Sequence, residues 1–547
     1  MLGHNFQITR SIKKKLSGPK RVIFLGKRDF QVSLDFSMKS YIDINVMKKF
    51  NFKGVFFSIV IAIPLNVFAH TNSDSSSVKL DLPSNPEKST LKVEPNGVAF
   101  YGEIEPILQD HCQTCHNPLG IAPFSLVTYE DAKNWAALIK QATSTKKMPP
   151  WSVTGGLPMK DDKRLSSQDI SMIANWVDND CPQGDLKNAR KPLEFKSVDT
   201  WDDENSPDIV LQVPGTFHLA AKGDDLYRTF VIPFNNPEGF NVRKSQIIPG
   251  NSKIIHHALG FFDGSGLSLD AQTRLGNVEP KGLGDQDYGS GYSSGMGLGF
   301  VPNPANIKKN KSMASGNIMG WVPGAQKTVS YPKGVVRAVP ANSDLLLQVH
   351  YVRTGQPEID NGTRAGIWLL KEQPQRYANG YLLDTDFRLI PKNVANFRSS
   401  GSIEILEDSE LFLMSPHMHR LGKEMRIWYQ PKGSGARQLL LEVKNWDFNW
   451  QLRYHPKEPF FLKKGSSLFV ETIHDNSADN PKNLFNPPRD IFLGEETKDE
   501  MGFAIISVIQ AKKPVNNIAT TGFLKYLIKL IEAEAYKKLK GVFDEDK

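Results

Sequence analysis

Residues 112 to 116 read Cys112-Gln113-Thr114-Cys115-His116, and they contain two of only three cysteines in 547 residues. This pattern is typical of covalent haem attachment, in which both thiols add to the haem vinyl groups and the adjacent histidine binds the iron. A thioredoxin-like dithiol or half of a zinc site would need a preceding strand or a second ligand pair, and the sequence shows neither. The segment therefore predicts helices packed around a haem.

Helical periodicity flanks the motif on both sides. Upstream, the apolar residues Phe100, Ile104, Ile107 and Leu108 recur at helical spacing, so we expect an amphipathic helix that ends at the motif. Downstream, residues 166–169 resemble a capping box that opens a second helix with its apolar face at Ile170, Ile173, Ala174 and Val177. These patterns predict a small all-α cytochrome c domain over residues 95–190.

The sixth iron ligand should be a methionine or histidine beyond the first helix. Met148, in Lys-Met-Pro-Pro-Trp, is the best placed, because the following proline keeps its backbone in a loop. Met159 is a second choice, and Met172 fits better inside the second helix. The stretches 121–126 and 148–151 resemble the small cytochrome c domains that are fused to bacterial exported oxidoreductases. Cys181 is left as a structural thiol.

The start of the chain reads as a targeting segment. From Met47, three lysines alternate with aromatic residues, an apolar run follows, and Val67-Phe68-Ala69 is a small-residue cleavage pattern. Residues 47–69 thus predict a signal peptide and a periplasmic or secreted protein, with residues 1–46 as an upstream extension from a mis-assigned start. A membrane anchor is the alternative, but the run is short and broken by proline.

The net charge of +8 belongs to this leader. Residues 1–69 hold 12 Lys and Arg against 3 Asp, which leaves 55 basic and 56 acidic residues in the rest. The mature chain is therefore nearly neutral, and we expect no nucleic-acid partner.

No cysteine follows position 181, so a later metal site must use histidine, methionine or carboxylate. In a strand, the spacing of His417 and His419 places both imidazoles on one face. His256 and His257 are neighbours and would point to opposite faces, so both can bind one ion only at a bulge, a twist or a strand end. His350 closes an apolar strand-like run. Such ligands suit copper or zinc, and an added methionine favours copper.

Five motifs occur in the order that is found in one enzyme family. They are Trp321-Val322-Pro323-Gly324-Ala325, Tyr331-Pro332-Lys333-Gly334-Val335, Leu347-Gln348-Val349-His350-Tyr351, the run from His417 to Lys423, and Asp499-Glu500-Met501. Together they resemble the type II copper, ascorbate-dependent monooxygenases, the family of peptidylglycine α-hydroxylating monooxygenase and dopamine β-hydroxylase. The resemblance covers about residues 200–510.

The resemblance implies two copper ions. His256, His257 and His350 would hold the first ion. His417, His419 and Met501 would hold the second ion and form the catalytic site, because a thioether favours Cu(I) and leaves a position open for dioxygen. Ordinary core packing is the alternative for Met501. The family also implies ascorbate or another external reductant.

The departures from the family pattern bear on the substrate. Where the peptidylglycine enzyme holds its substrate's carboxylate, this chain has Ser415, Phe503 and Ile505. Losing a charged group and gaining two apolar ones favours a neutral or apolar small molecule. Three other histidines have no counterpart and are taken as surface or structural residues: His218, His455 and His474.

Strand-like runs separated by turns predict β-sandwiches after a polar linker at 183–205. The resemblance implies two jelly-roll-like domains, at 200–385 and 386–515. The Gly/Ser-rich stretch 263–320 is long enough for a lid or docking loop. Residues 516–547 form a predicted amphipathic helical tail with Leu524, Leu527, Ile528, Ile531 and Ala535 on one face. We expect the tail to dock on the body or a partner, with no stable membrane span.

These features predict a periplasmic copper monooxygenase that hydroxylates a C–H bond of a small molecule with dioxygen. Its fused haem would supply electrons, aided by a periplasmic electron donor. Two alternatives are a redox carrier or copper-handling protein of the same fold, and a chain whose haem serves a separate partner while its copper sites are vestigial.

Overall fold

The computed structural model describes residues 97–513, apart from 121, 196, 198, 204, 224, 277–285, 295–318 and 323–327, and parts of two other segments. The chain divides into two compact units, residues 1–91 and 92–547. In the first unit only a pairing of β1 (Ile23–Phe24) with β2 (Gln31–Val32) is described. The predicted signal peptide at 47–69 and most of the extension at 1–46 lie outside the described residues.

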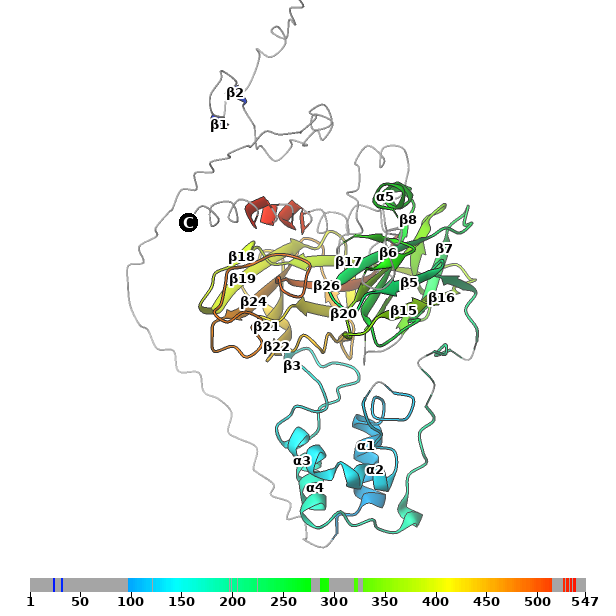
Figure 1. Ribbon diagram of the computed structural model, residues 1–547, viewed down its shortest axis with the longest axis vertical. Helices are drawn as coiled ribbons and strands as arrows, with labels where there is room; N and C mark the ends of the chain where they lie inside the picture. Colours follow the sequence, from blue (N-terminus) through cyan, green and yellow to red (C-terminus); the bar gives the residue numbers. More distant parts are fainter. Residues whose placement is uncertain are drawn as a thin grey trace, which may run out of the picture. The chain divides into compact units, whose positions relative to one another are not determined.

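The described part of the second unit is mostly β-sheet, with a group of short helices before the sheets (Figure 1). The helical elements are η2 (Phe100–Ile104), α1 (Glu105–His111), α2 (Tyr129–Asn134), α3 (Ala136–Ser144), α4 (Ser167–Asp178), η3 (Leu186–Asn188) and α5 (Leu267–Leu275). A shared apolar cluster, which includes Phe100, Ile104, Leu108, Ile173 and Trp176, joins η2, α1 and α4. The helix predicted after the Cys-x-x-Cys-His motif is present as α4. The helix predicted before it is present as α1, but Tyr101 and Gly102 have non-helical backbone angles, so Phe100 lies outside the regular helix.

Local sequence explains where these helices begin and end. Ser166 caps α4, because its hydroxyl accepts the backbone N–H of Asp169 and the Asp169 carboxylate accepts the N–H of Ser166, as the capping box predicts. Pro106 stands in the first turn of α1, where its missing N–H costs no hydrogen bond. Cys181 is 6 % exposed and packs in the helical cluster, as is typical of a structural thiol.

Two sheets face one another across residues 209–369, here called the first β region. The five-stranded sheet has the order β10-β6-β14-β8-β11: β10 (Tyr292–Ser293), β6 (Leu226–Ile232), β14 (Asp344–Tyr351), β8 (Ile255–Asp263) and β11 (Met319–Trp321). The facing sheet contains β7 (Phe240–Ile248), β16 (Arg364–Leu369), β13 (Val335–Val339), β4 (Ile209–Gln212) and β12 (Thr328–Ser330). A small third sheet contains β15 (Glu358–Asn361), β5 (Thr216–Leu219) and β9 (Tyr288–Gly289).

The second β region, residues 376–510, has the same two-layer plan. One layer is formed by β17 (Arg376–Asp384), β26 (Gly502–Gln510), β20 (Ser409–Met418) and β23 (Phe460–Leu462). The other layer contains β19 (Val394–Glu404), β24 (Ser467–Asn476), β21 (Gly422–Gln430), β22 (Gln438–Lys444) and β3 (Val153–Gly156). Strands β18 (Leu389–Ile390) and β25 (Ile491–Phe492) pair separately, and an apolar cluster fills the space between the layers.

One sheet runs through both regions. Strand β13 of the first region pairs in parallel with β17, so that β4, β16, β7, β13, β17, β26, β20 and β23 form one continuous order. The predicted boundary at 385 falls after β17, yet β17 pairs along its length with β26 of the second region. The sequence could not show this, because a strand's partner is not encoded in its own alternation.

Part of the predicted 95–190 domain belongs to the second β region. Strand β3 adds to the edge of β22, and the side chains of Val153 and Met159 enter the core of the second region. The ring of Trp151 packs edge-on against Tyr454 at 5.3 Å. The segment that follows Met148 is therefore anchored to the second β region.

The predicted C-terminal helix is present in the described residues 525–526, 528–530, 532–533 and 535–537, here called the tail helix. Its buried face is made by Tyr526, Lys529 and Ala533, whereas Ile528 is 48 % exposed. The predicted apolar face, which included Ile528 and Ala535, was wrong at both positions. The tail helix packs on the body, and in the described part of the chain no helix has the length and apolarity needed to cross a membrane.

Candidate metal centres

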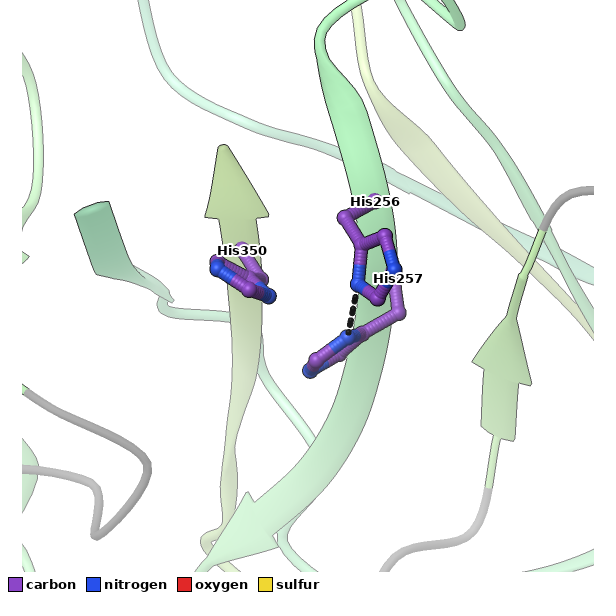
Figure 2. A group of neighbouring side chains, drawn as sticks. All are labelled: His256, His257 and His350. Atoms are coloured by element: carbon purple, nitrogen blue, oxygen red, sulfur yellow. Dashed lines mark hydrogen bonds between the residues drawn. The ribbon is translucent and has the colours of Figure 1, made fainter. Parts of the chain in front are cut away.

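Three histidines converge in the first β region (Figure 2). His256 and His257 lie on β8 and His350 lies on the neighbouring strand β14, and one ligand atom from each falls within 4.8 Å of the others. The Nδ1 atoms of His256 and His257 are 3.2 Å apart, and one donates a hydrogen bond to the other. The three residues predicted for the first copper are thus brought together.

A bulge explains how two neighbouring residues reach one centre. His350 pairs with His257, but Tyr351 pairs with Ile255, so His256 has no partner in the ladder. The extra residue turns the local backbone and brings the His256 imidazole to the side of its neighbour. A bulge is one of the three geometries, with a twist and a strand end, that would let His256 and His257 bind one ion.

The ring nitrogens of His256, His257 and His350 are suited to bind a metal ion. Both nitrogens of His350 are buried without a hydrogen-bond partner, although Nε2 lies 3.4 Å from Asp225 Oδ2. Burial lowers the pKa of His256 to about 4 and that of His257 well below its usual value. Neutral imidazoles with free lone pairs are what a divalent or monovalent metal ion requires.

His417 and His419 form the second group. Their rings lie 5.2 Å apart and nearly perpendicular; His417 lies on β20, whereas His419 follows the end of that strand at Met418. His417 Nδ1 bonds with Gln451 Oε1 at 2.7 Å, and His419 Nδ1 bonds with the Asp499 carbonyl at 3.1 Å. Because these oxygens can only accept, both Nδ1 atoms carry the proton and each Nε2 is left as the lone-pair donor. The Nε2 of His417 is buried without a partner.

Glu500 holds the backbone at this site. Its carboxylate accepts the N–H groups of His419, Leu421 and Met501, and it is fully buried. Burial raises the pKa of Glu500 to about 8 against the lowering effect of these three hydrogen bonds. The middle residue of Asp499-Glu500-Met501 therefore fixes the end of the strand that carries the histidines.

Met501 is fully buried beside this site. Its backbone N–H and that of His419 share one Glu500 oxygen, so the two main chains are adjacent. Its sulfur accepts a hydrogen bond from Tyr526 of the tail helix at 3.6 Å, within a cluster that includes Phe387 and Phe503. That Met501 completes a second three-ligand set stays a prediction.

The residues expected to shape the substrate site share one face next to His417. Ser415 pairs with Ile505 and His417 pairs with Phe503 across β20 and β26, so all four side chains project to the same side. The Phe503 ring lies 4.7 Å from the His417 ring. The surface beside His417 is accordingly apolar.

Phe448 connects the two histidine groups. Its ring stacks on His256 at 5.0 Å and meets His419 edge-on at 5.7 Å. Both Phe448 and Gln451 lie in the loop between β22 and β23, and no motif marked either residue in the sequence. Only the tertiary structure shows that this loop contacts both groups.

The residues predicted to attach haem form a turn at the end of α1. The His116 N–H donates to the Cys112 carbonyl at 3.0 Å, and His116 Nδ1 bonds with the Phe124 carbonyl at 3.1 Å. Burial raises the pKa of Cys112 to about 12 and also raises that of Cys115. The bond to Phe124 leaves His116 Nε2 for an axial position, and two nearby thiols suit covalent attachment.

The three methionines considered for the sixth iron position differ in their surroundings. Met148 is half-buried in a loop, as expected. Met159 packs in the core of the second β region, and Met172 packs against the helical cluster as predicted. Met148 stays the predicted ligand.

The remaining histidines of the β regions have structural contacts. His474 is fully buried and donates through Nε2 to the Met501 carbonyl at 3.0 Å. His455 Nδ1 donates to the Phe412 carbonyl at 3.0 Å, and the His218 ring stacks on Tyr288 at 4.1 Å. The stretch 263–320 contains α5, whereas residues 277–285 and 295–318 of the predicted lid or docking loop lie outside the described part.

The contact between the tail helix and β17 predicts a pH-dependent contribution to stability. Lys529 forms a buried ion pair with Asp384, whose pKa burial raises to about 6 despite the lysine. A carboxyl group with a raised folded pKa favours the folded state at low pH, and this contribution is lost as the pH rises through about 6. Lys529→Met should therefore lower the free energy of unfolding by about 3 kcal/mol at pH 7.5, and by much less at pH 5, where Asp384 is protonated.

Urea unfolding at the two pH values measures this difference. Lys525→Met, on the exposed side of the tail helix, is the control, and Asp384→Asn in the Lys529→Met background should restore stability at pH 7.5. Equal losses at both pH values would contradict the prediction.

Comparisons with known proteins add no family. No family model matches the chain, and no curated protein matches it. Among solved structures, the major capsid protein P2 from bacteriophage PM2 is 9 % identical with a TM-score of 0.18, over 55 % of this chain and 97 % of that chain. A structure of infectious bursal disease virus, Gx strain, is 9 % identical with a TM-score of 0.15, over 58 % and 77 %. These scores are too low to support any statement on fold or function.

Proposed function

We propose that this protein is an exported copper-dependent monooxygenase of the type II, ascorbate-dependent kind. It would hydroxylate a C–H bond of a neutral or apolar small molecule with dioxygen. The single observation that carries the proposal is the convergence of His256, His257 and His350, whose buried nitrogens include two on His350 that have no hydrogen-bond partner. The pairing of His417 with His419 supports a second site.

The chain's own residues would prepare both sites. Copper would supply the one-electron and dioxygen chemistry that side chains lack. Lowered pKa values keep His256 and His417 neutral, and Gln451 and the Asp499 carbonyl orient the second pair. Outer contacts of this kind commonly change metal affinity by about 10- to 100-fold.

Substrate selection would follow from the face beside His417. Phe503 and Ile505 offer apolar contact there, and Ser415 offers only a hydroxyl. A charged substrate group would lose its hydration on this face without gaining an ion pair, whereas an apolar group would bury surface favourably. This supports a neutral or apolar substrate.

We further propose that residues 95–190 form a cytochrome c domain that feeds electrons to the copper sites. A covalently attached haem would be held by Cys112, Cys115, His116 and Met148, and it would supply one-electron transfer. Two contacts support the arrangement: Trp151 packs on Tyr454, and Tyr454 exchanges two backbone hydrogen bonds of 2.9 Å with Met414, on the strand of His417. A tethered donor acts at a high effective concentration.

Metal analysis and oxygen uptake test the proposal. Protein matured in a host that attaches c-type haem should contain two coppers per haem. When reduced and given a panel of apolar substrates, it should consume oxygen beyond its own stoichiometric reoxidation and release a product heavier by one oxygen atom. Oxygen uptake that stops after reoxidation for every substrate would refute the proposal.

A redox carrier or copper-handling protein is the second candidate. The observation that favours it is the hydrogen bond between Tyr526 and the Met501 sulfur, which engages the soft ligand in another contact. A carrier needs no open oxygen position. One copper per haem or none, with reversible reduction and no product, would support this function.

A further inference from the structure

A cavity of about 550 Å³ opens beside His256, between residues of the first and second β regions. Its lining combines polar and charged groups with the apolar side chains of Val352, Phe448 and Leu484. No sequence motif pointed to it. Its lining shows which ligand chemistry it suits.

Two cations of this lining are already paired with acids, and the Asp225 carboxylate is held by a hydroxyl and an imidazole. Asp225 contacts Thr497 and His350, Lys498 lies 2.8 Å from Glu496, and Arg353 is paired with Asp287 at 2.7 Å. These ion pairs leave little charge for a guest.

Arg420 differs from its neighbours. Among the arginine and lysine residues of this lining in the described part of the chain, it alone has no ion pair, and its Nε is buried without a hydrogen-bond partner. Its guanidinium lies over the Phe448 ring, 5.8 Å from the centroid. A buried guanidinium N–H without an acceptor is costly, and a carboxylate or enolate would satisfy it.

The position of Arg420 beside the histidines gives a second reason to expect an anion in the cavity. Arg420 directly follows His419, and it lines the same cavity as His256. A metal ion at the neighbouring histidines would add positive charge close to this arginine. An anion between them would offset the repulsion, and in a partly desolvated cavity such compensation matters more than in water.

We propose that this cavity binds a small organic monoanion, whose charged end pairs with Arg420 and whose flat apolar part packs on Phe448. The shared chemistry is a delocalised anion, either a carboxylate or the enolate of an ascorbate-type reductant. A role for this anion in the reaction rests on the proposed function. Binding of the anion to the cavity does not depend on that function.

Calorimetric titration of the metal-free full chain tests the site without copper. The probes are benzoate, ascorbate under anaerobic conditions, and benzyl alcohol as the neutral match of benzoate. At least one anion should bind, and benzyl alcohol should bind at least about tenfold more weakly than benzoate if benzoate is the one bound. Binding of ascorbate alone assigns the site to the reductant, and binding of benzoate alone assigns it to a carboxylate.

Variants identify the residue responsible. Arg420→Gln should weaken anion binding by about 10- to 100-fold, and Arg420→Lys by less, because lysine keeps the charge but loses the planar fork. Arg437→Gln, which removes a surface arginine paired with Glu471, should leave binding unchanged. Circular dichroism and the thermal midpoint check that each variant is folded.

The proposal is overturned if neither anion binds below about 10 mM, if benzyl alcohol binds as well as benzoate, or if folded Arg420→Gln binds like the parent. Because no metal is present, such a result would leave the monooxygenase proposal standing. Failure of the copper and oxygen experiments with intact anion binding would refute only the enzyme activity.

Discussion

Replacing His417 with alanine is expected to remove one of two bound coppers and to lower oxygen-dependent product formation by more than about 100-fold. Losing even an outer partner of a metal ligand costs about 10- to 100-fold in metal affinity or activity, and losing the ligand itself should cost more. The buried, unpartnered Nε2 of His417 is the atom whose lone pair would be lost. The first site, built from His256, His257 and His350, should keep its copper.

Copper content per polypeptide and product yield by mass spectrometry measure this effect. His455→Ala is the matched control, since His455 lies in the same β region but donates only to the Phe412 carbonyl. It should keep both coppers and most of the activity. Unchanged turnover in His417→Ala would place the chemistry elsewhere, and loss of both coppers would show that the two sites are not independent.

Glu500→Ala is expected to lower the free energy of unfolding by about 4 kcal/mol. Three buried backbone N–H groups would lose their acceptor, at roughly 1–3 kcal/mol each. Burial of the Glu500 carboxyl group, which raises its pKa to about 8, is itself unfavourable. Removing this group therefore offsets part of the loss. Because one of these donors is His419, the variant should also bind copper more weakly at the second site.

Denaturant unfolding of the metal-free protein, followed by copper titration, checks both effects. Glu407→Ala is the control, because that exposed carboxylate of the same β region lies 3.9 Å from the Lys464 ammonium and should contribute less than about 1 kcal/mol. An unfolding midpoint for Glu500→Ala equal to that of the control would show that the three N–H groups find other partners.

Much of the arrangement follows from short-range pattern. The capping box at Ser166 and the apolar spacing before Cys112 predicted helices that the structure contains, because a helix is set by contacts three and four residues apart. The spacing of His417 and His419 predicted that their imidazoles lie close together, and the rings are 5.2 Å apart although His419 follows the end of β20. Strand geometry alone also required a bulge, a twist or a strand end if His256 and His257 share one ion, and the structure shows which of the three occurs.

Long-range pairing was not available from the sequence. Strand β3 of the predicted haem segment completes a sheet of the second β region, and β17 joins that region across the predicted boundary at 385. The tail helix buries Tyr526 and Lys529 rather than Ile528, because a tyrosine hydroxyl and a lysine can find partners in the surface that receives them. A periodicity that counts only apolar residues misses such a face.

The sequence by itself determined the ligand types and their local spacing, since imidazole, thiol and thioether positions are fixed along the chain. The tertiary structure alone decided that His350 meets His256 and His257, that Phe448 stands between the two histidine groups, and that Arg420 faces a cavity. These juxtapositions depend on which strands pair and how a long loop packs. Those choices minimise the free energy of the whole chain and are not written in any one segment.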